Sequence, residues 1–288
     1  MLGAGAEYLA RQIDNETSWK LCGSSEVIEY VIDPPEFFSA LDWDSIPYPQ
    51  KSFDGPDSTT GWLFKRPHTC GGIGISRTPS AKSGYWQKEI NGESISAICI
   101  ADQNSAELLG VNMQFTQALT DALPYVYKGA IANYPISDEI SFKINTYINK
   151  LKDSFNLIGV FSVDMILSSN ALFVLEINPR VSASFELYEQ INPGLNLVDA
   201  HIRVCEGEQL SKMDLSVNVC AYQIVYADRE LTIPRQMNWP KWSKDKPEAN
   251  RHIQQYEPIC SVFAEGSKEE IPKLLEQRSQ EIFNQLYQ

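Results

Sequence analysis

The chain lacks several features that mark common classes of protein. No apolar run approaches the roughly 20 residues of a membrane span, and the N-terminus has neither the basic start nor the apolar core of a secretory signal. Its six cysteines form no C-x-x-C pair, a usage typical of reduced thiols in a cytoplasm rather than of disulfides or a zinc site. We therefore expect a cytoplasmic protein with no membrane partner.

Basic charge is also scarce. The sequence has 24 Lys and Arg residues against 37 Asp and Glu residues, which gives a net charge of −13. This charge repels the phosphates of nucleic acids and of anionic lipids. This charge argues against a nucleic-acid partner. If the chain binds a nucleotide, something local, such as a bound metal ion, must offset the repulsion of its phosphates.

A dinucleotide-binding fingerprint is missing as well. Residues 3–13 contain G-x-G in "GAGAEYLARQI", but no strand precedes the motif and its third glycine is absent. With 288 residues and a hydrophobic content of 43%, the chain is long enough to form two or three lobes.

What is present is an irregular succession of helical and strand patterns. Apolar residues at helical spacing predict four helices, whereas the glycine-rich stretch 68–77 and the stretch 125–135 are interpreted as loops. This order predicts an α+β fold with mainly antiparallel strands rather than regular βαβ units. The predicted helices are 33–43, 137–155, 194–208 and 268–287, and the predicted strands lie in 61–67, 85–102, 107–116, 158–180, 218–227 and 258–266.

A strand near the middle of the chain carries polar residues inside an apolar run. In "FVLEINPRVSASFE" (173–186), Glu176 and Asn178 point to the same face because strand side chains alternate. A strand end that reaches solvent would explain these two residues. Asp164, in the preceding strand "GVFSVDMIL", adds a third oxygen ligand, and a divalent cation such as Mg²⁺ would relieve the repulsion between the two carboxylates.

This interpretation predicts the register of the hairpin. Asp164 and Glu176 can share a cation only if they lie on one face, and directly opposed residues do so. That pairing leaves residues 169–171 as a three-residue loop, with Asn170 best suited to a left-handed conformation. A bulge would have the same effect on the register. We expect both carboxylates and Asn178 to face Lys65 across a cleft.

Three further segments suggest a nucleotide. Lys65 ends an apolar strand just before the loop "CGGIGIS" (70–76), whose glycines expose backbone N–H groups to anionic oxygens. The segment "YWQKEINGE" (85–93) can offer backbone groups to an adenine edge, and Glu93 could accept hydrogen bonds from ribose hydroxyls. If each segment is considered alone, residues 70–76 could equally form an ordinary loop and residues 85–93 a plain hairpin.

In their order and spacing, these motifs resemble the ATP-grasp superfamily. "VLEINPRV" (174–181) is similar to a motif of carbamoyl-phosphate synthase and biotin carboxylase, and residues 244–264 resemble the tail of predicted ATP-dependent carboligases. The resemblance implies an ATP-grasp fold, in which two α+β lobes with mainly antiparallel sheets grip ATP. It divides the chain into a remnant of an N-terminal domain with its linker (1–55), a small lobe (56–118), a large lobe (119–213) and a β-rich C-terminal extension (214–288).

The same resemblance implies roles for individual residues. It assigns phosphate contacts to a lysine and a glycine loop, adenine and ribose contacts to the following strand and turn, and Mg²⁺ or Mn²⁺ ligands to the hairpin. The residues are Lys65 with Gly71, Gly72 and Gly74 for the phosphates; Gln87, Lys88 and Ile90 for adenine; Glu93 for ribose; Asp164, Glu176 and Asn178 for the metal; and Arg180 for the transferred phosphate.

The sequence departs from the family pattern in two places. Ser162 stands where many relatives have an arginine, and only Lys20 or Lys51 could replace the first family lysine. The activity implied is ligation of a carboxylate to an amine or thiol through an acyl phosphate, with release of ADP and phosphate, in the biosynthesis of cofactors or amino-acid-derived small molecules. Two alternatives are a carboxylase or carbamate-forming enzyme that uses bicarbonate, and a non-catalytic nucleotide-binding subunit that needs a partner chain.

The shortened N-terminal part leads to one expectation about assembly. If residues 1 to about 40 are a remnant, they should leave apolar surface uncovered around Phe37, Phe38 and Trp43, and such patches usually mark an interface. We therefore expect a homo-oligomer or a partner subunit. The three histidines are interpreted as structural or surface residues: His68, His201 and His252.

Overall fold

The computed structural model describes residues 22–23, 33–79, 83–169 and 171–287. The helices are α3 (Pro34–Trp43), α4 (Asp138–Ser154), α5 (Phe185–Ile191), α6 (Leu197–Cys205) and α7 (Ile271–Leu286). The strands are β1 (Lys51–Ser52), β2 (Trp62–Lys65), β3 (Ile75–Ser76), β4 (Tyr85–Lys88), β5 (Glu93–Ala101), β6 (Ala106–Gln117), β7 (Val126–Ala132), β8 (Gly159–Ser168), β9 (Ala171–Asn178), β10 (Cys220–Tyr226), β11 (Leu231–Thr232), β12 (Ser243–Lys244), β13 (His252–Ile253) and β14 (Pro258–Glu265).

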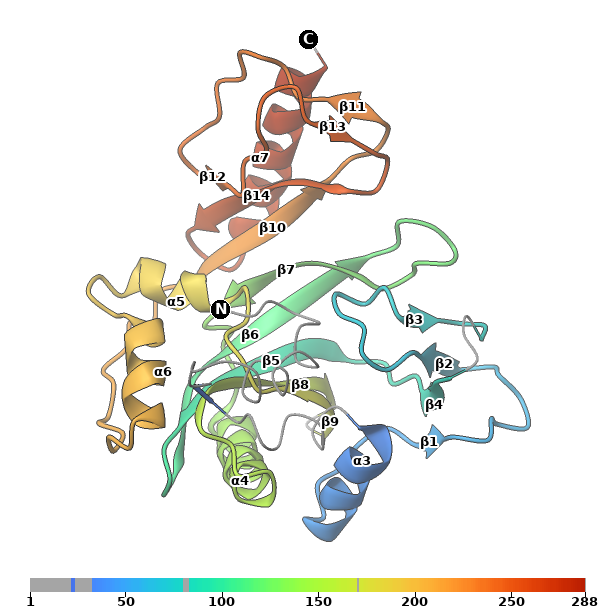
Figure 1. The fold of residues 1–288 in the computed structure, drawn as a ribbon, viewed down its shortest axis with the longest axis vertical. Helices are drawn as coiled ribbons and strands as arrows, with labels where there is room; N and C mark the ends of the chain where they lie inside the picture. The colour runs from blue at the N-terminus through green and yellow to red at the C-terminus, as the bar shows by residue number, and fades with distance from the viewer. Residues whose placement is uncertain (1–21, 24–32, 80–82, 170, 288) are drawn as a thin grey trace, which may run out of the picture.

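Two antiparallel sheets organise the molecule (Figure 1). Eight strands form one sheet in the order β12-β14-β10-β7-β6-β5-β8-β9, and four form the smaller sheet β1-β4-β2-β3. Every strand pair assigned in the described residues is antiparallel. The predicted α+β class is confirmed. The segment 125–135 is an exception to the sequence analysis, because it contains β7 where a loop was expected.

The sheets do not divide the chain where the sequence suggested. Strands β5 and β6, assigned to the small lobe, are central in the eight-stranded sheet, and β10, β14 and β12 of the expected extension continue that same sheet (Figure 1). The small sheet is therefore built from residues 51–88 only. A hairpin can extend whichever sheet edge it meets, so pairing partners rather than sequence order decide this division.

Helices pack on both faces of the large sheet. Helix α4 packs on Ile95 and Ala97, and α7 packs on Ile131 and Ala221, which are neighbours on the same face through their cross-strand pairs. Helices α5 and α6 cover the part of the opposite face that includes Ile98, Val160 and Cys220. The remainder of that second face is available to form a site.

Helix α4 follows the predicted pattern closely. The Ser137 side chain accepts a hydrogen bond from the Ile140 backbone N–H, and Asp138 and Glu139 occupy the first turn near the positive end of the helix dipole. Ile140, Ile144, Ile148 and Leu151 are buried at helical spacing. No helix among the described residues is long and apolar enough to cross a bilayer.

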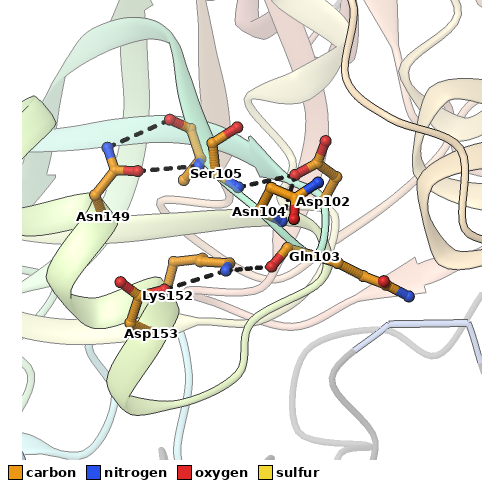
Figure 2. A network of polar contacts seen from close by, with 8 residues as sticks. Asp102, Gln103, Asn104, Ser105, Asn149, Lys152 and Asp153 are labelled. Carbon is orange, nitrogen blue, oxygen red and sulfur yellow. Dashed lines mark hydrogen bonds and ion pairs between the residues drawn. The ribbon is translucent and has the colours of Figure 1, made fainter.

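A group of polar contacts fixes the β5–β6 turn against helix α4 (Figure 2). The buried Asp102 accepts a hydrogen bond from the backbone N–H of Ser105 at 2.8 Å. It also accepts one from the backbone N–H of Leu210 at 2.7 Å. Lys152 of α4 donates to the carbonyl of Gln103 at 2.7 Å. These bonds satisfy polar groups that would otherwise be buried without a partner. Each buried polar group without a partner would cost about 1–3 kcal/mol.

The expected apolar patch near the N-terminus is largely absent. Phe37 and Phe38 are buried, at 4% and 0% exposure, because α3 packs on the core that α4 covers. Trp43 is exposed, at 87%. The interface was predicted around Phe37, Phe38 and Trp43. Two of these three residues are therefore not on the surface.

Candidate active site

A cavity of about 440 Å³ lies between the small sheet and the second face of the large sheet. Its walls come from α3, from the small sheet with its glycine loop, from six strands of the large sheet, and from the loop after β9. The lining residues are Pro34, Phe37, Lys65, Arg66, Pro67, His68, Thr69, Cys70, Gly71, Gly72, Ile75, Tyr85, Ser96, Gln114, Tyr127, Ser162, Asp164, Leu175, Glu176, Ile177, Asn178, Arg180, Ser182, Ala183, Ser184 and Tyr222.

The β8–β9 hairpin places the two predicted carboxylates directly opposite each other. Asp164 pairs with Glu176, and Ser162 pairs with Asn178, as the shared face requires. The route to this register is the bulge rather than the three-residue loop, since the register shifts after Asp164 and Ser168 pairs with Ala171. Ser169 has a φ of 46°, and the left-handed conformation expected at Asn170 lies outside the described residues.

Asn178 joins the two carboxylates. Its Nδ2 donates to Asp164 Oδ2 at 3.3 Å and to Glu176 Oε1 at 3.4 Å. Gln114 Nε2 of β6 donates to Asp164 Oδ1 at 3.2 Å. Burial, with repulsion from Glu176, raises the pKa of Asp164 to about 7. The pair therefore tends to hold either a proton or a cation.

Lys65 contributes a positive charge to the same cavity. It lies at the end of β2 in the small sheet, and Glu176 and Asp164 act on it electrostatically. Burial lowers the pKa of Lys65, and attraction by the two carboxylates partly opposes this effect. The expected arrangement of Lys65 facing the carboxylates is present.

The glycine loop is docked on the start of β7. The Tyr127 N–H donates to the Gly71 carbonyl at 2.9 Å. A Cβ on Gly72 would lie only 1.9 Å from the Tyr125 carbonyl oxygen, so only glycine permits this approach. Gly71 and Gly72 line the cavity, whereas Gly74 packs against Thr69 inside the loop and does not.

An ion pair connects the small sheet to the same end of β7. Arg77 donates from both terminal nitrogens to the Glu89 carboxylate, at 2.8 and 2.9 Å, and to the Tyr125 hydroxyl at 2.8 Å. The Tyr125 hydroxyl donates to Glu89 in turn. The loop after β3, the turn after β4 and the residue just before β7 are thereby held together. We refer to Arg77, Glu89 and Tyr125 as the interlobe latch.

The predicted adenine residues lie next to the cavity rather than in its lining. Gln87 is 2% exposed on β4, and its Nε2 has no hydrogen-bond partner among the described residues. Lys88 extends over the Trp62 ring, with Nζ 5.3 Å from its centroid. Ile90 is half-buried in the turn that follows.

Glu93 is not beside the cavity, which corrects the expected ribose contact. Its neighbour Ser94 faces the cavity side and donates to Gln114, so alternation along β5 turns Glu93 to the opposite face. There Glu93 accepts a hydrogen bond from the Tyr134 hydroxyl at 2.7 Å.

Arg180 lies in the cavity wall just after β9. It donates to Asn178 Oδ1 at 3.3 Å and to the Val181 carbonyl at 3.3 Å. The next turn supplies the paired hydroxyls of Ser182 and Ser184, 2.9 Å apart. The guanidinium of Arg180, next to the carboxylate pair, can donate two parallel hydrogen bonds to an anion such as a phosphate.

The structure also shows where the residues that depart from the expected pattern lie. Ser162 is buried and lines the cavity beside Asn178. Lys51 does not line it: the Lys51 ammonium donates to the Tyr48 hydroxyl at 2.8 Å and lies 4.6 Å from the centroid of the Phe38 ring. Lys20 lies outside the described residues.

The histidines differ from one another in surroundings. His201 accepts from the Val160 N–H at 2.8 Å, and His252 pairs with Glu230 on the surface, so both match the structural or surface interpretation. His68 is exposed on the glycine loop but lines the cavity.

Sequence reasoning missed a polar row across the cavity floor. Ser96, Gln114, Tyr127 and Tyr222 come from four neighbouring strands and line the cavity. A signal existed in part, since Ser94 and Ser96 on β5, and Asn112 and Gln114 on β6, place polar side chains at every second position of apolar strands.

Comparison with known proteins agrees with this architecture. The fold is an α+β structure in which two antiparallel sheets enclose one cavity. A family model described as the ATP-grasp domain matches residues 35–184, more than half of the 288 residues. The chain therefore belongs to the ATP-grasp family.

Three individual matches are informative. The carbamoyl phosphate synthase large chain of Clostridium perfringens is 30% identical over 93 residues, which are 31% of this chain and only 9% of that protein. The L-amino acid ligase of Bacillus licheniformis aligns with a TM-score of 0.74 at 12% identity, covering 97% of this chain and 78% of the ligase. The biotin carboxylase domain of 2-oxoglutarate carboxylase from Hydrogenobacter thermophilus, solved with MgADP and bicarbonate, aligns with a TM-score of 0.71 at 16% identity, covering 91% and 68%. At these identities the two structures establish the fold alone.

Proposed function

We propose that the chain is an ATP-dependent ligase that binds ATP in the cavity and activates a carboxylate. The observation that carries this proposal is the opposed pair of Asp164 and Glu176 facing Lys65 across the cavity. Membership of the ATP-grasp family supports it.

The hairpin fits a magnesium ion. Two carboxylates and an amide oxygen are hard ligands, and Mg²⁺ is commonly held by one or two carboxylates together with phosphates of the substrate. Asn178 Nδ2 now contacts both carboxylates, and rotation of the amide would present its oxygen instead. When bound, the ion would neutralise phosphate charge during transfer.

The small sheet fits the nucleotide base. The buried Gln87 Nε2, without a partner in the described parts of the chain, is a hydrogen-bond donor that a base could satisfy. Residues 88–90, which follow it, would supply backbone groups to the same base. Lys65 and the backbone of Gly71 and Gly72 would contact the phosphates.

The chemistry we propose has two balanced steps. An oxygen of the substrate carboxylate attacks the γ-phosphorus of ATP, the bond to the bridging oxygen breaks, and ADP leaves. An amine or thiol then attacks the carbonyl carbon of the acyl phosphate and releases phosphate, with loss of one proton. Arg180 and Lys65 would stabilise the negative charge that is shared by the transferred group.

Trapping the acyl group tests this function. The purified chain is incubated with Mg²⁺, ATP, hydroxylamine and a panel of carboxylic acids, and hydroxamate and ADP are measured. We expect hydroxamate that depends on ATP and on one class of acid. Release of AMP, or ADP without hydroxamate for every acid, would refute ligase chemistry.

The same assay separates the two alternatives. A carboxylase would release ADP with bicarbonate, the anion found with the Hydrogenobacter thermophilus domain. A non-catalytic subunit would bind MgADP in calorimetry and release no ADP from ATP. The buried Ser162, at a position where many relatives have arginine, makes this second control necessary.

A further inference from the structure

The cavity floor has a charged end and an uncharged end. Asp164, Glu176 and Arg180 lie at the end formed by β8 and β9 and the loop after them. Gln114 of β6, Tyr127 of β7 and Tyr222 of β10 form the other end. None of the lining residues at this second end carries a charge.

The two tyrosines form a donor aimed at the cavity. Their hydroxyl oxygens are 2.8 Å apart and share one hydrogen bond. Two hydroxyls that share one bond use one of their two hydrogens, so the other remains for an acceptor. Burial raises the pKa of Tyr222 to about 12 and also raises the pKa of Tyr127 well above its usual value, so both stay protonated at neutral pH.

Packing holds this pair in one position. The Tyr222 ring stacks on Phe263 of β14, with centroids 5.8 Å apart and planes at 28°, and Lys244 covers Phe263 at 4.4 Å. The Tyr226 hydroxyl donates to the Tyr127 carbonyl at 2.8 Å. A donor that is already held in place by packing loses less entropy when it binds an acceptor, so it contributes more to affinity than a mobile donor does.

Charge limits what this end can accept. The carboxylates among the described lining residues are Asp164 and Glu176, which face each other in the proposed metal site. Outside the lining, Glu186 and Asp245 also act electrostatically on Tyr222, but Glu186 is paired with Lys244 and Asp245 accepts a hydrogen bond from the Ser261 hydroxyl. Within the cavity, the ammonium of an α-amino acid would therefore meet a lining carboxylate only by competing with a bound metal ion. Burial of such a charge without a partner is costly.

We propose that the Tyr127–Tyr222 end binds the uncharged remainder of the carboxylate substrate, an acid that carries a hydroxyl or carbonyl oxygen and no ammonium group. This inference rests on the proposed function, in which the reacting carboxylate lies near Arg180. Tyr222 is then a specificity-determining residue that the C-terminal strands supply to the site.

Matched pairs of acids test the substrate class. L-lactate and L-alanine, and L-3-phenyllactate and L-phenylalanine, each differ in a hydroxyl against an ammonium. With Mg²⁺, ATP and hydroxylamine, we expect kcat/KM for hydroxamate formation to be about tenfold or more higher for the hydroxy acid of a pair. A kcat/KM for the amino acid that equals or exceeds that for the hydroxy acid overturns the inference. The inference is also overturned if neither hydroxy acid reacts, or if NMR line broadening shows that neither binds the MgADP-loaded chain.

Variants test the role of Tyr222. Tyr222→Phe keeps the ring stack and removes the hydroxyl, so we expect the KM for the hydroxy acid to rise about tenfold with the KM for ATP unchanged. Tyr287→Phe is the matched control, since the Tyr287 ring also stacks on a phenylalanine, Phe283, and its hydroxyl donates to Asp228 away from the cavity lining. Equal effects of the two variants, or an equal rise in the KM for ATP, overturn the assignment.

The outcomes separate this inference from the proposed function. Hydroxamate formed from amino acids in preference to hydroxy acids leaves the ligase function intact and refutes only the substrate class. Absence of hydroxamate with every acid, despite MgADP binding in calorimetry, refutes both.

Discussion

Asp164 on β8 and Glu176 on β9 are directly opposed residues of an antiparallel pair, and the side-chain amide of Asn178 donates a hydrogen bond to each. Burial, together with repulsion between the two carboxylates, raises the pKa of Asp164 to about 7. The site is thus poised to exchange a proton for a cation.

Removing either carboxylate should remove metal dependence. Asp164→Asn and Glu176→Gln are each expected to lower Mg²⁺-dependent ADP release by about 100-fold or more, because a neutral amide binds Mg²⁺ poorly. The measurement is steady-state ADP release against Mg²⁺ concentration. Asp153→Asn, an exposed carboxylate on α4, is the control and should have no effect. Activity of Glu176→Gln at the parental level would refute the metal site.

Stability should depend on pH through Asp164. The folded chain holds this proton up to about pH 7, whereas an unfolded aspartate loses it near pH 4. The stability that this group contributes is therefore present below about pH 4 and is lost as pH rises to 7. In EDTA at pH 8 we expect Asp164→Asn to have a higher melting temperature than the parent, by an amount that shrinks toward pH 4.

Differential scanning fluorimetry across this pH range measures the difference directly. Saturating Mg²⁺ with ADP should reduce it, because the cation stabilises the parental carboxylate pair and not the variant. A difference that is constant from pH 4 to pH 8 would contradict the assigned pKa.

Two neighbouring glycines should respond differently to alanine. In Gly72→Ala the new Cβ meets the Tyr125 carbonyl at 1.9 Å, and φ is +78°, so the loop must move. Gly71→Ala adds only the cost of a left-handed alanine, about 1–2 kcal/mol, because nothing lies within 4 Å. We expect calorimetric MgADP affinity to fall about tenfold more in Gly72→Ala. Equal losses would show that the docking on β7 does not position the loop.

The interlobe latch should control opening of the small sheet. Arg77→Met removes the bonds to both Glu89 and Tyr125, and we expect faster limited proteolysis within 66–79 and a several-fold higher KM for ATP. The matched control is Arg203→Met. Arg203 lies on α6, and the substitution removes its exposed ion pair with Glu208. Surface ion pairs contribute about 0–1 kcal/mol, so a change limited to global melting temperature would contradict the latch.

Much of this molecule follows from local sequence patterns. The apolar spacing and the cap at Ser137 define α4, and alternation in β8 and β9 puts Asp164, Glu176 and Asn178 on one face whatever surrounds them. The hairpin register also followed from the sequence, although the bulge and not the loop length produced it. These features depend on residues close in the chain, so their geometry is set by backbone periodicity.

The tertiary structure decided the features that join distant segments. Glu93 faces Tyr134 rather than a ribose because β5 lies in the large sheet, and β10 brings Tyr222 to Tyr127 across 95 residues of chain. The approach of Gly72 to Tyr125 is equally non-local. Which sheet edge a strand joins depends on the burial of whole surfaces, and no local pattern records that choice. The sequence therefore determined the hairpin with its opposed carboxylates, and only the assembled sheets determined the cavity around it.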